Sequence, residues 1–112
     1  MTWQRTGVKA EAVAEGGLVG TTVGARSIVL SRVAGQLRAV DGICPHIGGE
    51  LADGSVEEGR ITCPLHGATF DLVSGTVRAD PVGVAPPEGG VGPLSVIPLR
   101  LADGEVEVDL PA

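Results

Sequence analysis

The cysteines and histidines of this chain come as two close pairs, and this pairing constrains the fold more than any other feature. Cys44 stands two residues before His46, and Cys63 stands three residues before His66. The chain has two cysteines and two histidines in all, so the pairs use every one of them. Each pair lies among Pro and Gly, in the stretches CPHIGGEL and CPLHGATF. Such tight loops suit a metal site better than a disulfide, and they predict two loops that extend from strand ends.

Composition indicates a single all-β domain. The 112 residues are enough for one domain with a modest core. There are 18 glycines and 8 prolines, against one Trp, one Phe and no Tyr. This balance is typical of short strands joined by many turns rather than of long helices. We therefore expect one domain that spans residues 1–112.

Charge and hydropathy exclude two classes of partner. The formal net charge of −6 argues against nucleic acid, because phosphate contacts need a surplus of Lys and Arg. An acidic surface suits a basic protein partner, and it suits simple solubility equally well. The first residues show no secretory signal, and no stretch approaches the roughly 18 apolar residues of a membrane span. The sequence predicts a cytoplasmic protein, and the reducing cytosol disfavours a disulfide.

Turn signals divide the chain into short strands. Two-residue turns such as Ala34-Gly35 and Ser74-Gly75 separate apolar runs, as in β-hairpins. Residues 8–17 are read as a strand or irregular segment followed by a loop, and residues 79–93, rich in Pro and Gly, as a long loop. The strands that we expect are residues 18–23, 27–33, 37–40, 55–57, 60–62, 69–73, 76–78, 95–101 and 105–110.

The last expected strand alternates plainly between apolar and acidic residues. A strand places successive side chains on opposite faces of its sheet. We therefore predict one buried face and one exposed acidic face. The inward residues are Val106, Val108 and Leu110, and the outward residues are Glu105, Glu107 and Asp109.

The spacing Cys-x-His-x16-Cys-x2-His resembles that of the Rieske iron-sulfur proteins. In that family both cysteines bind one iron of a 2Fe-2S cluster and both histidines bind the other. The resemblance implies that Cys44, His46, Cys63 and His66 hold one such cluster. A zinc site of two Cys and two His is the alternative, although zinc fingers tend to group like ligands.

Other residues of the two stretches have two readings each. Gly48, Gly49 and Gly67 are either ordinary turn residues or positions where backbone N–H groups approach the sulfur atoms. Phe70 is more readily explained as core packing than as a cluster contact.

The resemblance covers nearly the whole chain and is to the small Rieske ferredoxins of bacterial ring-hydroxylating oxygenases. It implies three antiparallel sheets, with a cluster-binding subdomain at about residues 43–80 and the histidines facing solvent. Relatives cover the cluster with a third, proline-bearing loop. Here the corresponding residues 81–93 form a longer segment, so either Pro81 or Pro86 is a candidate for that role.

The same resemblance implies a one-electron carrier rather than an enzyme. A non-haem iron oxygenase needs a further site of two histidines and a carboxylate, and both histidines are already used. No G-x-G-x-x-G fingerprint for a nucleotide cofactor is present. The expected partners are a flavoprotein ferredoxin reductase and a terminal oxygenase. The alternatives are a small Rieske subunit of a complex like nitrite reductase and a zinc-stabilised structural module.

A low reduction potential is also expected from the resemblance. High-potential relatives carry a disulfide across the cluster loops and two hydroxyl groups that donate to cluster sulfur. The corresponding positions in this chain are Gly49, Leu65, Ala68 and Phe70. None of these residues can form the disulfide or donate from a hydroxyl, so the potential should lie near the low end of the Rieske range.

Overall fold

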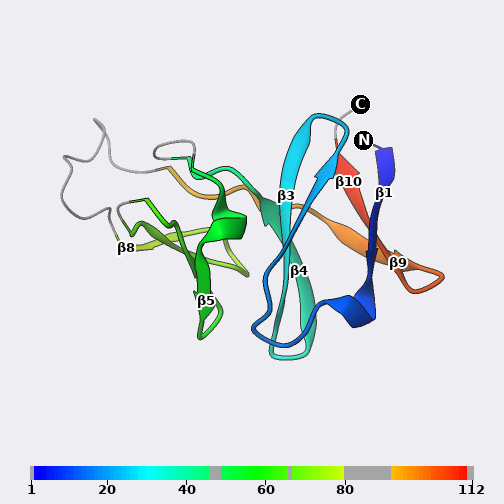
Figure 1. Cartoon of the computed structure of the whole chain (residues 1–112), viewed down its shortest axis with the longest axis horizontal. Helices are drawn as coiled ribbons and strands as arrows, with labels where there is room; N and C mark the ends of the chain where they lie inside the picture. Colours follow the sequence, from blue (N-terminus) through cyan, green and yellow to red (C-terminus); the bar gives the residue numbers. More distant parts are fainter. Residues whose placement is uncertain (1, 46–48, 66, 80–91, 111–112) are drawn as a thin grey trace.

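A computed structural model describes residues 2–45, 49–65, 67–79 and 92–110, and within these ranges it contains three antiparallel sheets (Figure 1). The expected all-β class and the three sheets are confirmed. The sheets have the strand orders β1-β10-β9, β2-β3-β4 and β5-β6-β7-β8. The strands are β1 (Thr2–Lys9), β2 (Val19–Val23), β3 (Arg26–Val33), β4 (Gln36–Asp41), β5 (Ser55–Glu57), β6 (Arg60–Thr62), β7 (Thr69–Asp71), β8 (Val77–Ala79), β9 (Leu99–Ala102) and β10 (Glu105–Leu110). Two single 3-10 turns, Ala10–Ala12 and Leu51–Asp53, interrupt the connections.

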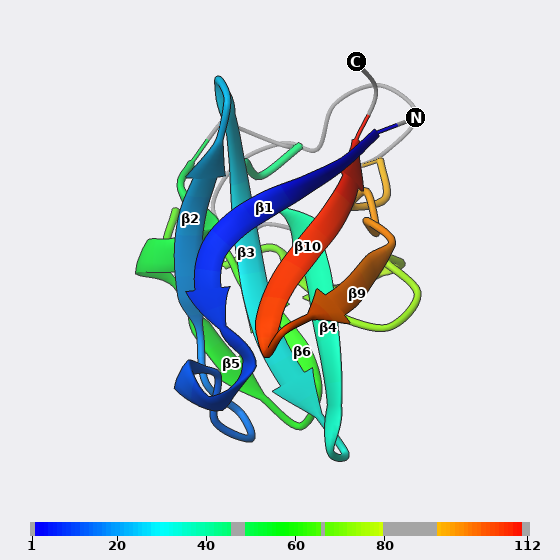
Figure 2. The ribbon, with the colours of Figure 1, turned by 90° about the vertical axis from the view of Figure 1, so that its right-hand side faces the viewer.

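The sheet β2-β3-β4 is the middle layer of the molecule (Figure 2). Ile28 and Leu30 of β3 pack with Val106 and Val108 of β10 in one core. Val29, between them, belongs to a second core, built largely from the β5–β8 half and including both cysteines. Since successive residues of a strand face opposite sides, β3 is buried on both faces, and the two cores share one wall.

The turn between β3 and β4 is held by a carboxylate from a distant part of the chain. Ala34 and Gly35 both have positive φ, 51° and 80°, as in the two-residue turns that match strand twist. Their N–H groups donate to the two carboxylate oxygens of Glu15, each at 2.7 Å. The expected turn is therefore present, and Glu15 stabilises a backbone conformation that alanine seldom adopts.

The first strand was not expected in this form. Residues 2–9 pair with β10, and a bulge interrupts the register between Arg5 and Lys9. Gly7, at φ 78°, lies in the bulge, and its N–H donates to the Glu105 carboxylate at 3.0 Å. The prediction that Glu105 faces outward to solvent is wrong, since the residue is buried. The bulge and the Arg5 guanidinium, 2.9 Å away, supply the partners that make this burial possible.

Six expected strands begin or end elsewhere. Those expected over 18–23, 27–33 and 37–40 differ by one residue at one or both ends, as β2, β3 and β4. The strand over 69–73 ends at Asp71, because the Asp71 carboxylate accepts the N–H groups of Val73 and Ser74 and turns the chain. The strand over 76–78 is shifted by one residue, to β8. The strand over 95–101 begins only at Leu99, because Pro98 has no N–H to donate to a ladder.

Candidate metal centre

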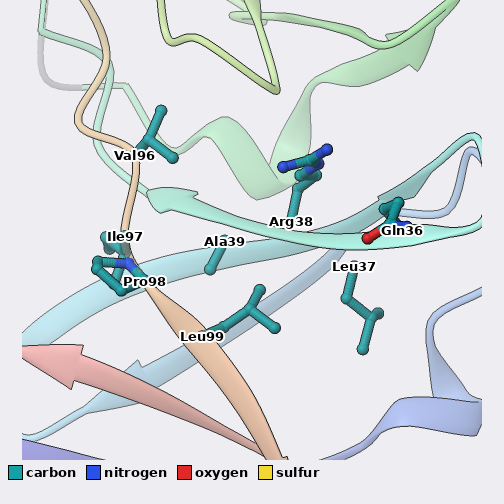
Figure 3. A pocket seen from close by; sticks show the side chains of 8 residues that line it. All are labelled: Gln36, Leu37, Arg38, Ala39, Val96, Ile97, Pro98 and Leu99. Atoms are coloured by element: carbon teal, nitrogen blue, oxygen red, sulfur yellow. The ribbon is translucent and has the colours of Figure 1, made fainter.

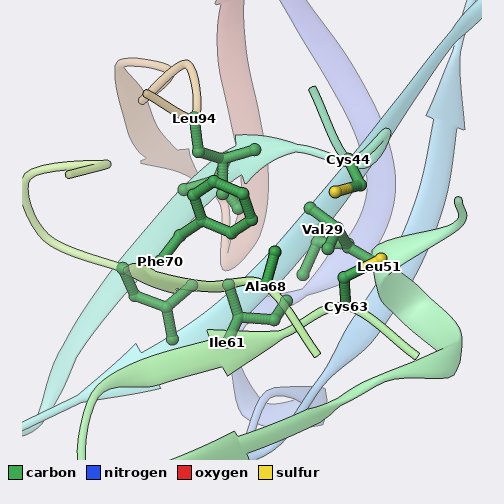
Figure 4. Close-up of a cluster of buried hydrophobic side chains, with 10 residues drawn as sticks. Val29, Cys44, Leu51, Ile61, Cys63, Ala68, Phe70 and Leu94 are labelled. Carbon is green, nitrogen blue, oxygen red and sulfur yellow. The ribbon is translucent and has the colours of Figure 1, made fainter. Parts of the chain in front are cut away.

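The two cysteines lie together at the junction of the two halves of the molecule. Cys44 follows β4 and Cys63 directly follows β6, and each is 1% exposed. Neither forms a disulfide, and Figure 4 shows their sulfur atoms close to one another beside Val29 and Leu51. The structure thus brings the expected cysteine pair together from residues nineteen apart in the sequence.

Each cysteine closes its own loop with the same hydrogen bond. The Cys44 N–H donates to the Gly49 carbonyl at 2.8 Å, and the Cys63 N–H donates to the Ala68 carbonyl at 2.8 Å. Both bonds join residue i to residue i+5. His46 is in the sequence segment closed by the first bond and His66 in that closed by the second, while both histidines lie outside the described residues. We call residues 44–49 the first loop and residues 63–68 the second loop.

Short strand pairs hold the bases of both loops. Ile43 forms a bridge with Glu50, and the Leu51 N–H donates to the Gly42 carbonyl at 2.9 Å. On the other side, Thr62 pairs with Thr69 in the β6–β7 ladder. Both loops therefore extend from strand pairs, as the sequence predicted, and backbone hydrogen bonds fix the described ends of each loop.

Gly49 lies where the second loop approaches closely. A Cβ atom at this position would lie 3.3 Å from Cys63 Sγ and 3.0 Å from Leu65 Cδ1. Gly67 has φ 74° with nothing within 4 Å of a Cβ, so it acts as a turn residue. Gly48 lies outside the described residues. Close approach thus explains Gly49, and turn geometry explains Gly67.

Burial raises the pKa of the Cys63 thiol above 9.0. The Leu65 N–H, which bonds the Cys63 sulfur, lowers this pKa, and the neighbouring Cys44 thiol raises it again. Two adjacent buried thiols favour their neutral form unless a cation lies between them, and a metal ion deprotonates a coordinating thiol outright. The donor set therefore fits one metal ion held by both sulfurs.

Apolar side chains pack against the two thiols on their core side. Ala68 and Phe70 are both fully buried in the same core as the cysteines, so the expectation that Phe70 is a core residue is confirmed. Two hydroxyl groups stand at the base of the second loop, those of Thr62 and Thr69, and they lie 3.2 Å from each other. Thr69 Oγ1 also donates to the Gly67 carbonyl. These hydroxyls have partners within the loop base.

Two residues support this core in ways that were not predicted. Leu94, 3% exposed, packs over Phe70, and its N–H donates to the Gly75 carbonyl at 2.8 Å. Gly75 was expected only as a turn residue. A Cβ there would overlap the Leu94 carbonyl oxygen, so Gly75 also lets the segment after residue 92 reach the core. Pro81 and Pro86, the candidates for a covering proline, lie outside the described residues.

Among the described residues, no group of three or more His, Cys, Asp or Glu side chains is placed to hold a metal ion. No helix in this part of the chain is long and apolar enough to cross a membrane.

Comparison with known proteins identifies the family. Residues 2–92 match the Rieske 2Fe-2S domain. The anthranilate 1,2-dioxygenase ferredoxin subunit of Burkholderia cepacia is 32% identical over 87 residues, which cover 78% of this chain and 73% of that protein. The solved ferredoxin of Sphingomonas yanoikuyae B1 has 26% identity and a TM-score of 0.78, over 96% of this chain and 97% of that one.

A second solved structure is a complex of reduced oxygenase and oxidised ferredoxin in carbazole 1,9a-dioxygenase. One of its chains has 28% identity and a TM-score of 0.76, over 95% of this chain and 91% of that one. These matches agree with the paired loops and the two buried thiols. The chain therefore belongs to the Rieske 2Fe-2S family, and its cofactor is a 2Fe-2S cluster rather than the zinc ion that two Cys and two His alone left open.

Proposed function

We propose that this protein is a soluble Rieske ferredoxin, a one-electron carrier that takes an electron from a flavoprotein reductase and passes it to a terminal oxygenase. The observation that carries the proposal is the pair of loops closed by the same Cys N–H bond, at Cys44 and at Cys63. The relatives named as ferredoxin components of dioxygenase systems support the carrier role, and so does the solved complex of a ferredoxin with an oxygenase. We also infer a cytoplasmic location and one domain, with the cluster-binding part at about residues 43–80.

The proposed ligands are Cys44 and Cys63 on one iron and His46 and His66 on the other. When bound, the cluster supplies a single reversible electron. The chain's own residues bury both thiols and direct the Leu65 N–H at the Cys63 sulfur. Three buried apolar side chains, those of Ala68, Phe70 and Leu94, pack in the same core as the two cysteines. This apolar surface limits the access of water to the sulfur atoms.

Leu65 marks the side from which a partner reaches the site. Its side chain is 46% exposed, whereas the neighbouring Cys63 is 1% exposed. An exposed apolar side chain beside a buried redox centre suits contact with another protein. We therefore infer that electrons enter and leave past the second loop.

The carrier role is tested by following one electron through the reconstituted protein. The holoprotein should be reduced by a flavoprotein ferredoxin reductase with NADH and should be reoxidised by an oxidised terminal oxygenase, both followed in the visible spectrum. A protein that shows a Rieske spectrum but exchanges electrons with neither partner class would contradict the carrier role and leave the family unchanged.

The ligand assignment is tested by single substitutions. We expect Cys44→Ala, His46→Ala, Cys63→Ala and His66→Ala each to lose the intact cluster, because the chain holds no other Cys or His to replace a lost ligand. Iron and acid-labile sulfide assays, with the visible spectrum, measure this loss. Leu65→Ala is the matched control, since it lies between two proposed ligands and should keep full iron content. A normal spectrum in His66→Ala would show the assignment to be wrong.

A further inference from the structure

A groove runs along the side of the molecule where the first two sheets part. One hollow of about 380 Å³ is lined by residues of β4 and by the segment that leads into β9. A second, of about 280 Å³, continues it along β9 and shares Gln36, Leu37 and Leu99 with the first. In Figure 2 β9 lies in front of β4, and the two strands are in contact at this seam. We call the two hollows together the seam groove.

Both strands at the seam are edge strands of their sheets, and part of the β4 edge has no neighbouring strand within the described part of the chain. The Ala39 carbonyl accepts the Ile97 N–H and the Asp41 N–H donates to the Ser95 carbonyl, so these groups of β4 point outward. Along a strand, every second residue directs its backbone N–H and C=O to the same edge. Leu37 therefore directs both groups to the edge of β4 that faces away from β3, as Ala39 and Asp41 do. The facing segment turns away at Pro98, which has no N–H and whose carbonyl accepts from Asp109. Among the described residues no strand lies beside Leu37.

The seam groove has a distinct chemistry on each side of β4. Leu37 and Leu99 point to one side, and Arg38 points to the other (Figure 3). Leu101, 53% exposed, extends the apolar side. The Nε of Arg38 is buried with no hydrogen-bond partner among the described residues, and a buried donor of this kind is costly unless a partner arrives. The groove therefore offers an apolar row on one face and, on the other, the Arg38 side chain, whose Nε has no partner among the described residues.

The groove is basic although the chain is acidic. Three of the chain's eight Lys and Arg residues line it, namely Arg32, Arg38 and Arg100. Arg100 is already paired with Glu107 at 2.8 Å, so Arg32 and Arg38 are the arginines of the groove that form no ion pair with a described residue. None of the chain's fourteen Asp and Glu residues is among the described residues that line it. The charge complementary to this surface is negative.

We propose that the seam groove binds an extended acidic segment of a partner protein, which adds a strand to the free edge of β4 at Leu37. Its side chains would alternate, apolar toward Leu37 and Leu99 and carboxylate toward Arg38. The molecule already contains a strand pair of this kind, in which an arginine of one strand bonds a carboxylate of an alternating acidic strand. On its other edge, β9 pairs with β10, the sequence EVEVDL, and Arg100 Nε donates to Glu107 at 2.8 Å. This docking site is separate from the loops and does not depend on the carrier role.

The direct test uses a capped synthetic peptide of the sequence EVEVDL with the holoprotein. Isothermal titration should show binding, and hydrogen exchange should slow at residues 36–38. The peptide KVKVKL, with the same alternation and the opposite charge, is the control and should not bind. Binding of both peptides, or protection at β1 in place of residues 36–38, would overturn the proposal.

Two variants separate the charge from the backbone contact. Arg38→Gln should weaken binding of EVEVDL about fivefold by removing one charge pair, while Arg60→Gln, an exposed arginine of β6, should leave it unchanged. Leu37→Pro removes an N–H that makes no ladder bond and should abolish binding while the cluster spectrum persists. Unchanged binding in both groove variants, or a dimer of this chain that Arg38→Gln dissociates, would overturn the proposal.

Discussion

Ala68 and Phe70 determine what the sulfur atoms of the site can contact. Both side chains are fully buried next to the cysteines and neither carries a hydroxyl. A hydroxyl donor stabilises the additional negative charge of a reduced cluster more than the oxidised cluster. Its absence favours the oxidised form, and so the residues around the thiols point to a low potential within the Rieske range of roughly −150 to +300 mV.

We expect Ala68→Ser and Phe70→Tyr each to raise the midpoint potential. The rise should be several tens of millivolts, because a tenfold change in a one-electron equilibrium is about 59 mV. Protein-film voltammetry near neutral pH measures it. Val56→Thr, which adds a hydroxyl elsewhere on the same sheet, is the control and should not change the potential. A wild-type midpoint above about +100 mV would mean that another donor controls the cluster.

The cysteines of the site could be predicted from the sequence, but several of its contacts could not. Cys44 and Cys63 stood out because the chain has two cysteines and each precedes a histidine closely. Gly49 was recognised only as a possible turn or N–H donor, because its closeness to Leu65 depends on how two loops meet in space. Leu94 gave no signal at all, since one leucine in a Pro- and Gly-rich stretch has no period to mark it.

Among the strands, β1 is tied to β10 by the Glu105 side chain as well as by the backbone ladder. The Glu105 carboxylate accepts the Gly7 N–H and pairs with Arg5. The Gly7 N–H, and after it the Arg5 guanidinium, hold the pKa of Glu105 below its ordinary 4.5, although burial acts in the opposite direction. Residues 2–9 lacked an alternating pattern because the bulge breaks the period of two, so this strand could not be predicted from hydropathy.

We expect Glu105 to make part of the stability dependent on pH. A depressed pKa contributes stability that is present above 4.5 and is lost as the pH falls through the lower value of the folded state. Thermal unfolding between about pH 7 and about pH 3 should show Glu105→Gln less stable than wild type at neutral pH, with the gap narrowing in acid. Glu11→Gln, at an exposed position, is the control. A gap that stays constant with pH would contradict this role of Glu105.

A second prediction at this scale concerns the link between Gly75 and Leu94. Gly75→Ala should lose about 3 kcal/mol of unfolding free energy, because its Cβ would overlap the Leu94 carbonyl as well as straining a positive φ. Gly104→Ala has the same strain, φ 80°, with open space around the Cβ, and should lose about 1 kcal/mol. Urea unfolding of both holoproteins measures the difference. Equal losses would show that the approach of Leu94 does not constrain position 75.

The net charge of −6 on the whole molecule should affect the rate at which the protein associates with its redox partners. We expect the rate of reduction by a ferredoxin reductase to fall as salt is raised through about 0.1 M, where the Debye length is about 10 Å. Stopped-flow reduction across a salt series measures this rate, and reduction by a neutral photoreduced flavin serves as the control. A rate that is independent of salt would remove the steering effect and leave the carrier role intact.

The all-β class and three sheets could be predicted at this scale, because composition, turn signals and the resemblance pointed the same way. The sharing of β3 between two cores could not be predicted from periodicity. Its run of Ile28, Val29 and Leu30 shows no alternation, which fits a strand buried on both faces but does not say what covers each face. That assignment needs the positions of β10 and of the two loops.

The double burial of β3 also changes what fixes its alignment with β4. In a strand with one polar face, a slip of one residue exposes apolar side chains and is penalised at once. In β3, a slip of one residue would move Val29 into the core that now holds Ile28 and Leu30, and would move one of these into the core of Val29. All three side chains are apolar, so polarity alone distinguishes the two alignments poorly. The discrimination then depends on the turn at Ala34 and Gly35, whose conformation Glu15 stabilises through both N–H groups. A carboxylate from outside the hairpin thus helps to hold the alignment that directs Val29 into one core and Ile28 and Leu30 into the other.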